Sequence, residues 1–80
     1  MERFILYGTS ACHLCELAES MIEARGQAGV EFELEKVDIS GSDPLFERYG
    51  LMIPVLQHPD GRELCWPFTA EQLDPFLVGP

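Results

Sequence analysis

Two cysteines three positions apart are the residues of this chain best placed to do chemistry. Cys12 and Cys15 are separated by His13 and Leu14, a C-x-x-C spacing that lets the two sulfur atoms close a small disulfide loop. Such a pair can hold a metal ion together with other ligands, or it can exchange two electrons with a disulfide. The choice between these chemistries depends on the elements that carry the cysteines.

The chain around the cysteines predicts a buried strand followed by a helix. Residues 4–7 form a short apolar run that ends at Gly8, as expected for a strand covered on both faces. Apolar residues then recur at helical spacing and predict a helix over residues 12–25, capped by Ser10. Its predicted inward face consists of Leu14, Leu17, Ala18, Met21 and Ile22.

This context places the cysteine pair at the N-terminus of a helix. Free backbone N–H groups and the helix dipole there lower a cysteine pKa from about 8.5 towards roughly 3.5–7.5. Cys12 is therefore predicted to be the exposed nucleophile, and Cys15, one turn in, to resolve a mixed disulfide by attacking Cys12. His13 either stabilises the thiolate or is a solvated first-turn side chain, while Glu16 and Glu19 are interpreted as acidic partners of the helix dipole.

The middle of the chain predicts a second strand and a short helix. Residues 30–35 alternate between apolar and polar side chains, and the strand continues to Ile39 after a change of phase at Lys36. The short helix has Asp43 as its predicted N-cap and Pro44 at its first position. Its expected inward residues are Leu45, Phe46 and Tyr49.

The last third of the chain predicts a β-hairpin and a final helix. Residues 53–57 and 62–66 flank a Pro-Asp-Gly turn, which is typical of a hairpin. Thr69 then begins a helix with Gln72 as its capping-box partner, and Pro75 is expected to break or restart that helix.

The order of elements predicts one α/β domain over residues 1–80, with a mixed four-stranded sheet and helices on both faces. The fourth strand would run parallel to the first, so residues 65–68 are expected to approach the cysteine motif. Trp66 either lines a substrate groove there or packs in the core. Cys65 is predicted to be buried, with a regulatory disulfide as the alternative.

Composition excludes several classes of function. Fourteen acidic against five basic residues give a net charge of -9, which argues against nucleic acid and anionic membranes as partners. No apolar run is long enough to span a membrane, and the first residues do not resemble an export signal. We therefore expect a cytoplasmic monomer whose three cysteines serve catalysis, metal binding or packing rather than a disulfide framework.

Two stretches of the chain resemble the glutaredoxins and related proteins of the thioredoxin fold. Residues 4–15 are similar to their active-site segment, and Ile53-Pro54-Val55 is similar to their second signature. The tail Asp-Gly-Arg-Glu-Leu-Cys-Trp-Pro-Phe is also found in short, largely uncharacterised bacterial proteins of this kind. The resemblance implies the compact glutaredoxin form of the fold (β-α-β-α-β-β-α) and a cis Ile53–Pro54 bond. It also implies that the backbone of Ile53 pairs with an extended substrate.

Several residues that hold glutathione in glutaredoxins are replaced in this chain. Thr9 stands near the usual lysine, Met52 begins the segment that usually reads Thr-Val-Pro, and no Gly-Gly turn follows the last strand. Glutathione is thus expected as a reductant at most, and no bound cofactor or metal is predicted. The expected substrate-binding residues are His13, Leu14, Ile53, Pro54 and Trp66.

The sequence thus predicts a thiol–disulfide oxidoreductase that reduces a protein or small-molecule disulfide through the Cys12/Cys15 dithiol. The dithiol would be restored by glutathione or a flavoprotein reductase, and a partner with a basic or neutral surface is favoured by the charge. One alternative is a metal module in which Cys65 or His58 completes a zinc site, or in which two chains share an iron–sulfur cluster. The other is a non-catalytic adaptor with the same fold.

Overall fold

The computed structural model describes residues 2–78 and arranges them in the predicted order, with one 3-10 turn added after the second strand. The strands are β1 (Arg3–Gly8), β2 (Glu33–Asp38), β3 (Val55–Gln57) and β4 (Glu63–Cys65). The helices are α1 (His13–Gln27), α2 (Asp43–Tyr49) and α3 (Ala70–Val78), with the 3-10 turn η1 at Ile39–Gly41. None of the helices within residues 2–78 is long and apolar enough to cross a membrane.

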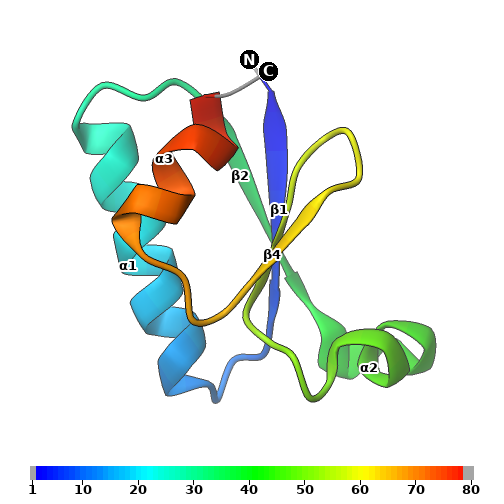
Figure 1. The fold of residues 1–80 in the computed structure, drawn as a ribbon. Coiled ribbons are helices and arrows are strands. Elements are labelled where there is room, and N and C mark those ends of the chain that lie inside the picture. The colour runs from blue at the N-terminus through cyan, green and yellow to red at the C-terminus, as the bar shows by residue number, and fades with distance from the viewer. Residues whose placement is uncertain (1, 79–80) are drawn as a thin grey trace.

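The strands form a mixed sheet in the order β2-β1-β3-β4, with β1 in an inner position (Figure 1). β1 pairs in parallel with β2, from Arg3 opposite Glu33 to Gly8 opposite Asp38. It pairs antiparallel with β3, which is itself antiparallel to β4, so β4 runs in the same direction as β1. The predicted mixed four-stranded sheet is confirmed.

Side chains of β1 enter two separate cores, one on each face of the sheet. Phe4 and Leu6 pack with α1 and α3 on one face, whereas Ile5 and Tyr7 pack with residues of η1 and α2 on the other. Figure 1 shows α1 and α3 on the same side of the sheet and α2 near its lower end. Because burial of a large apolar side chain stabilises a fold by ~1.5–3 kcal/mol, this two-sided packing holds β1 firmly in place.

Helix α1 is rotated relative to the predicted inward face. Its buried residues are Cys15, Ala18 and Ile22, whereas Leu14 and Leu17 are 46% and 42% exposed. The prediction that both leucines face the core is therefore wrong. Cys15 and Ala18 are small, so the helix contacts the sheet through a narrow stripe that leaves the leucines at its margins.

Strand β2 begins later than the alternating pattern predicts. Its ladder with β1 begins at Glu33 because β1 begins at Arg3, and residues 30–32 lie outside the strand. No bulge occurs at Lys36, since the register with β1 is continuous. The change of phase has another cause: Leu34 packs in the core under α1, and Val37 packs in the core under α2.

The two shorter helices also differ from the prediction in detail. The N-cap of α2 is Ser42 rather than Asp43, because the Ser42 hydroxyl accepts from the backbone N–H of Leu45. Phe46 is 55% exposed and does not face the core. A helix of seven residues makes only about two turns, so few of its side chains can face the sheet.

Helix α3 has the predicted capping box and one unexpected feature. Thr69 and Gln72 exchange side-chain-to-backbone hydrogen bonds of 2.9 and 3.2 Å. Pro75 does not break the helix, although it removes one backbone donor. The buried side chains of Leu73 and Leu77 on either side of it hold the helix against the sheet.

A polar cluster joins α2 to the hairpin on the second face of the sheet. The Tyr49 hydroxyl donates to the Glu63 carboxylate, whose other oxygen lies 3.5 Å from Arg48. The Tyr49 ring stacks on Tyr7 at 4.3 Å between centroids, and the Tyr7 hydroxyl donates to Gln57 at 3.2 Å. Burial raises the pKa of the Tyr49 phenol, and its hydrogen bond to Glu63 raises the pKa further, so the phenol remains a donor at neutral pH.

We predict that Tyr49→Phe lowers the free energy of unfolding by about 1.5–3 kcal/mol, because it removes a hydrogen bond to a half-buried charged group. Tyr7→Phe is the matched control: it removes a neutral hydrogen bond from the same stacked pair and is expected to cost only about 0.5–1.5 kcal/mol. Urea unfolding of both variants measures the difference. Equal losses of unfolding free energy in the two variants would show that the charge of Glu63 does not strengthen its hydrogen bond with Tyr49.

Candidate redox site at the start of α1

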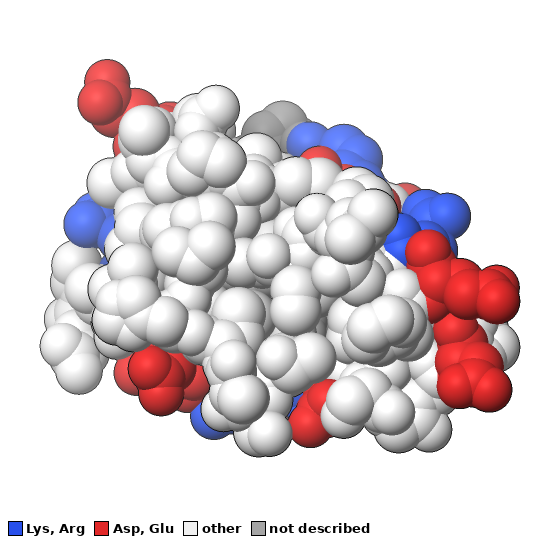
Figure 2. Space-filling model, turned by 90° about the horizontal axis from the view of Figure 1, so that it is seen from below, with Lys and Arg blue, Asp and Glu red and all other residues white. Residues whose placement is uncertain are grey.

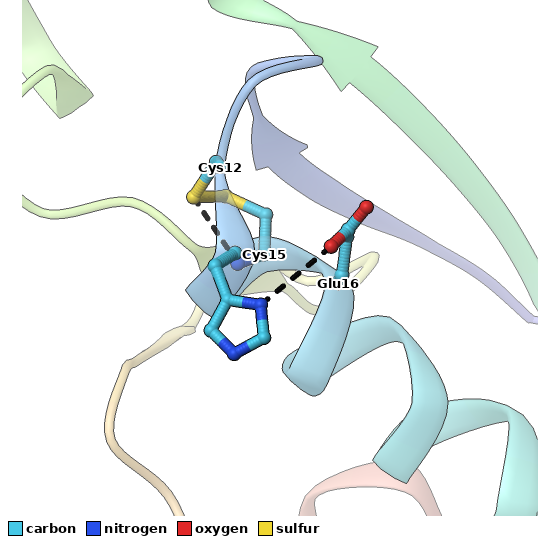
Figure 3. Close-up of a disulfide and its surroundings, with 4 residues drawn as sticks. Cys12, Cys15 and Glu16 are labelled. Atoms are coloured by element: carbon cyan, nitrogen blue, oxygen red, sulfur yellow. Dashed lines mark hydrogen bonds and ion pairs between the residues drawn. A yellow bond between two sulfur atoms is a disulfide. The ribbon is translucent and has the colours of Figure 1, made fainter.

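The two cysteines form a disulfide at the N-terminus of α1 (Figure 3). Cys12, not Ser10, is the N-cap, and its Sγ accepts a hydrogen bond of 3.1 Å from the backbone N–H of Cys15. This donor is one of the free amides of the first helical turn, and the helix dipole points its positive end at the same atom. Both effects favour negative charge on the Cys12 sulfur once the disulfide is reduced.

The two sulfurs differ in their access to solvent. Cys12 is partly exposed, whereas Cys15 is 8% exposed and lies against the end of β1. A Cβ atom added to Gly8 would lie 2.9 Å from the Sγ of Cys15, which is closer than two such atoms pack. The absence of a side chain at Gly8 therefore makes room for the buried sulfur.

The two residues between the cysteines point outward. The His13 side chain is 81% exposed, and its Nδ1 lies 3.7 Å from the Glu16 carboxylate, a pair drawn in Figure 3. Of the two interpretations of His13, this geometry favours the solvated first-turn side chain. Leu14 presents nearly half of its surface to solvent beside the disulfide.

The Ile53–Pro54 bond is cis, as the resemblance implied, and Pro54 is fully buried at the start of the hairpin. The backbone N–H of Ile53 already donates to the Tyr49 carbonyl at 3.0 Å. Within residues 2–78 no backbone N–H donates to the Ile53 carbonyl, so the predicted backbone pairing of Ile53 with a substrate would have to use this carbonyl.

The segment after β4 returns to the same end of the sheet as the cis-proline. The Trp66 backbone N–H donates to the Pro54 carbonyl at 3.0 Å, and the Trp66–Pro67 bond is also cis. The Trp66 ring is half-buried with its plane edge-on to Phe68, at 5.1 Å between centroids. The ring thus packs against the core under α1 and α3 while part of it stays accessible to solvent.

The prediction that Cys65 is buried is wrong, because its side chain is exposed. Cys65 lies opposite Val55 on the sheet face that carries α2, but β4 is the outer strand of the sheet. Its neighbour Leu64 points to the opposite face and into the core. Exposure of Cys65 therefore follows from strand alternation in an outer strand.

The proposed metal ligands are not gathered in one place. His58 lies at the hairpin turn, where its ring packs edge-on against Phe4 and Phe76. Phe4 is near the beginning of β1, whereas the cysteines follow the end of that strand. In the part of the chain that the structure describes, no three His, Cys, Asp or Glu side chains form a cluster suited to a metal ion.

A cleft of about 290 Å³ next to Cys15 contains groups that the sequence did not single out together. Glu19 reaches it from α1 and Lys36 from β2, and their side chains form an ion pair of 2.7 Å between Nζ and Oε2. Lys36 is opposite Leu6 in the parallel ladder. The register of a predicted parallel pair is the one signal that could have located this ion pair.

Comparison with known proteins identifies one family. Residues 3–78 match the family described as "Glutaredoxin-like domain (DUF836)", which covers nearly the whole chain. A comparison with curated proteins finds no match.

Several solved structures have the same fold. A crystal structure of the X. campestris protein XcR50 is 39% identical with a TM-score of 0.82, over 96% of this chain and 97% of that one. The solution structure of Ne2328 from Nitrosomonas europaea is 29% identical with a TM-score of 0.81, over 96% and 92% of the two chains. A structure described as that of a malarial protein has a TM-score of 0.68 at 12% identity and shows the fold alone.

We predict that Gly8→Ala displaces Cys15 and lowers the free energy of unfolding by about 1–3 kcal/mol, the usual cost of overpacking a core. The added methyl group would meet the Sγ and Cβ atoms of Cys15 at 2.9 and 3.3 Å. Gly41→Ala is the control, because a methyl group there has no atom within 4 Å. Chemical denaturation measures both, and an unchanged Gly8→Ala variant would contradict the close contact.

Proposed function

The chain belongs to the glutaredoxin-like domain family, and we propose that it is a thiol–disulfide oxidoreductase that reduces disulfides in proteins through Cys12 and Cys15. Cys12 attacks the substrate disulfide, and Cys15 then attacks Cys12 to release the reduced product. A thiol reductant or a flavoprotein reductase then reduces the Cys12–Cys15 disulfide back to the dithiol. We place this cycle in the cytoplasm, because it requires a reducing thiol pool.

The observation that carries this proposal is the different environment of the two sulfurs. The Cys12 sulfur accepts the Cys15 amide N–H at the positive end of α1 and is partly open to solvent. The Cys15 sulfur is covered, yet it lies close enough to bond to Cys12. An accessible sulfur with a stabilised thiolate and a protected partner are what the two steps of disulfide exchange require.

The distribution of cations favours a protein disulfide over glutathione disulfide as substrate. Glutathione carries carboxylates that need cationic partners, and each of the five basic side chains of this chain is already next to a carboxylate. The pairs are Arg3 with Glu33 and Glu35, Arg25 with Asp74, Lys36 with Glu19, Arg48 with Glu63, and Arg62 with Asp60.

Exposed apolar side chains support the same choice. Four large ones belong to the elements at the end of the molecule where α1 begins: Leu14, Phe46, Leu51 and Met52. Figure 2 views this end: uncharged side chains fill the middle of the face, and charged groups of both signs lie towards its rim. Acidic groups are the more numerous in the molecule as a whole, whose net charge is -9. A disulfide flanked by apolar residues, with basic residues further out, is complementary to such a surface.

We predict that Cys15→Ser traps a substrate protein as a stable mixed disulfide on Cys12, because the step that would release it has been removed. Mass spectrometry of the adduct, before and after reduction, is the measurement. Cys12→Ser is the control and should trap nothing. If Cys15→Ser also captures nothing and Cys12 resists alkylation at neutral pH, the assignment of the nucleophile fails.

A variant that lacks both cysteines separates catalysis from a role as an adaptor. If the double serine variant loses both disulfide exchange and the ability to recover the partner protein, the result supports catalysis. Unchanged binding and unchanged cellular effect of the double serine variant would instead support the adaptor.

We further predict that a disulfide peptide with apolar residues beside the cysteines and lysines at its ends is reduced with a kcat/KM at least about tenfold higher than glutathione disulfide. Added salt should lower this kcat/KM, because screening weakens the attraction between the cationic peptide and the acidic protein. A peptide with glutamates in place of the lysines is the matched control. A preference for glutathione disulfide would contradict the proposed substrate class.

A further inference from the structure

The cleft beside Cys15 joins a buried sulfur to titratable groups and to solvent. Its walls include Cys15, Glu16 and Glu19 from α1, and Lys36 and Asp38 from β2. The contribution of β1 to the cleft is uncharged. The cleft is large enough to hold water, which needs a space of only about 30 Å³ per molecule in the liquid.

Cys15 needs a proton acceptor if it resolves a mixed disulfide. Its thiol must become a thiolate as it attacks Cys12, and burial in apolar surroundings disfavours the charged form of a cysteine. The amide that stabilises charge at this helix terminus is directed at Cys12 and not at Cys15. The buried sulfur therefore relies on a neighbouring base to lose its proton.

Three carboxylates border the cleft, and two of them have other roles. Glu16 is 73% exposed and lies beside His13. Asp38 accepts from both the hydroxyl and the backbone N–H of Ser40, and these hydrogen bonds lower the pKa of Asp38. Asp38 is thus fixed as the anionic cap of η1 and is a poor proton acceptor.

Glu19 is the carboxylate best placed to serve Cys15. The two residues are four positions apart on α1, so their side chains share one face of the helix, and Glu19 leans towards the turn that carries Cys15. The Glu19 side chain is 27% exposed, far less than that of Glu16, and Lys36 fixes its carboxylate at 2.7 Å.

We propose that Glu19 is the proton acceptor for Cys15 in the step that resolves the mixed disulfide. This inference rests on the proposed function. The Cys15 sulfur bonds to the Cys12 sulfur while the bond between Cys12 and the substrate sulfur breaks, and the substrate leaves as a thiolate. The proton of Cys15 passes to the Glu19 carboxylate, directly or through one water in the cleft, and from there to solvent, which protonates the leaving thiolate.

Lys36 acts as a positioning residue in this scheme. Its hydrogen bond and attraction to Glu19 raise the pKa of the Lys36 ammonium, which therefore stays charged at neutral pH. Glu23, one turn further along α1, adds to the same effect. When Glu19 accepts a proton, the ammonium still faces the solvent and the Glu23 carboxylate, so neither partner is left as an isolated buried charge.

The test uses dithiobis(nitrobenzoate) as a substrate that releases two coloured thiolates in succession. The first release reports attack by Cys12, and the second reports closure of the disulfide by Cys15. Every protein in the series carries Cys65→Ser, because the exposed third thiol would also react. We expect Glu19→Gln to slow the second release by about a hundredfold, the lower end of what a general base contributes, and to leave the first unchanged.

The pH dependence distinguishes proton transfer from a structural role. With Glu19 present, the second rate should be nearly flat between about pH 6 and 8, because the carboxylate takes the Cys15 proton and the reaction does not depend on a preformed thiolate. In Glu19→Gln the same rate should rise about tenfold per pH unit, because only the small thiolate fraction of Cys15 reacts. The Glu19→Gln/Lys36→Met variant should have the same steep profile, which excludes an effect of the freed ammonium.

Glu31→Gln is the matched control, because it removes the same charge from an exposed residue outside the cleft that does not contact Lys36 in the scheme. Each variant should keep the unfolding midpoint of the parent protein. The inference is overturned if Glu19→Gln closes its disulfide with the parent's rate and pH profile, or if Glu31→Gln slows closure equally; the proposed function would survive either result. If the parent protein never releases the second thiolate, Cys15 does not resolve, and both proposals fail.

Discussion

The close contact between Gly8 and Cys15 is the constraint on which the arrangement of the site depends. β1 is held between two cores, so its last residue is a fixed surface against which the first turn of α1 packs. Because Gly8 has no side chain, the Cys15 sulfur occupies the space next to the strand. Cys12 lies one turn before Cys15, so its sulfur caps the N-terminus of α1 and is partly open to solvent. One missing side chain thus separates the sulfurs into a covered and an accessible one.

Uncharged side chains fill the middle of the face that Figure 2 shows, and the charged groups lie around it. Each basic side chain lies next to an acidic one, and exposed pairs of this kind stabilise a fold by only about 0–1 kcal/mol. Their larger effect is on recognition, because every Lys and Arg side chain within residues 2–78 already has a carboxylate neighbour that competes with an anionic ligand. The net charge of -9 then acts on approaching molecules through its long-range field.

The sequence predicted the order of elements, the mixed sheet, the hairpin and the Thr69–Gln72 capping box, because each depends on local periodicity or turn chemistry. It did not predict features that depend on how elements meet. The orientation of α1 depends on two small buried residues, Cys15 and Ala18, whereas the apolar pattern predicted that the larger leucines would be buried. Exposure of Cys65 came from its position in the outer strand β4, and the Glu19–Lys36 pair came from the register between two separate elements.

The two outer strands of the sheet have a consequence for how copies of this chain meet one another. A free strand edge offers unpaired backbone groups to any passing strand, and proteins protect such edges with charge or by keeping the strand short. Here β4 has only three residues, and β2 carries Glu33, Glu35 and Asp38 along its exposed edge. Pairing of two β2 edges would bring the carboxylates of both copies together, and Arg3, which lies beside Glu33 and Glu35, offsets only part of that charge. The acidic composition therefore also discourages edge-to-edge aggregation at the concentrations found in a crowded cell.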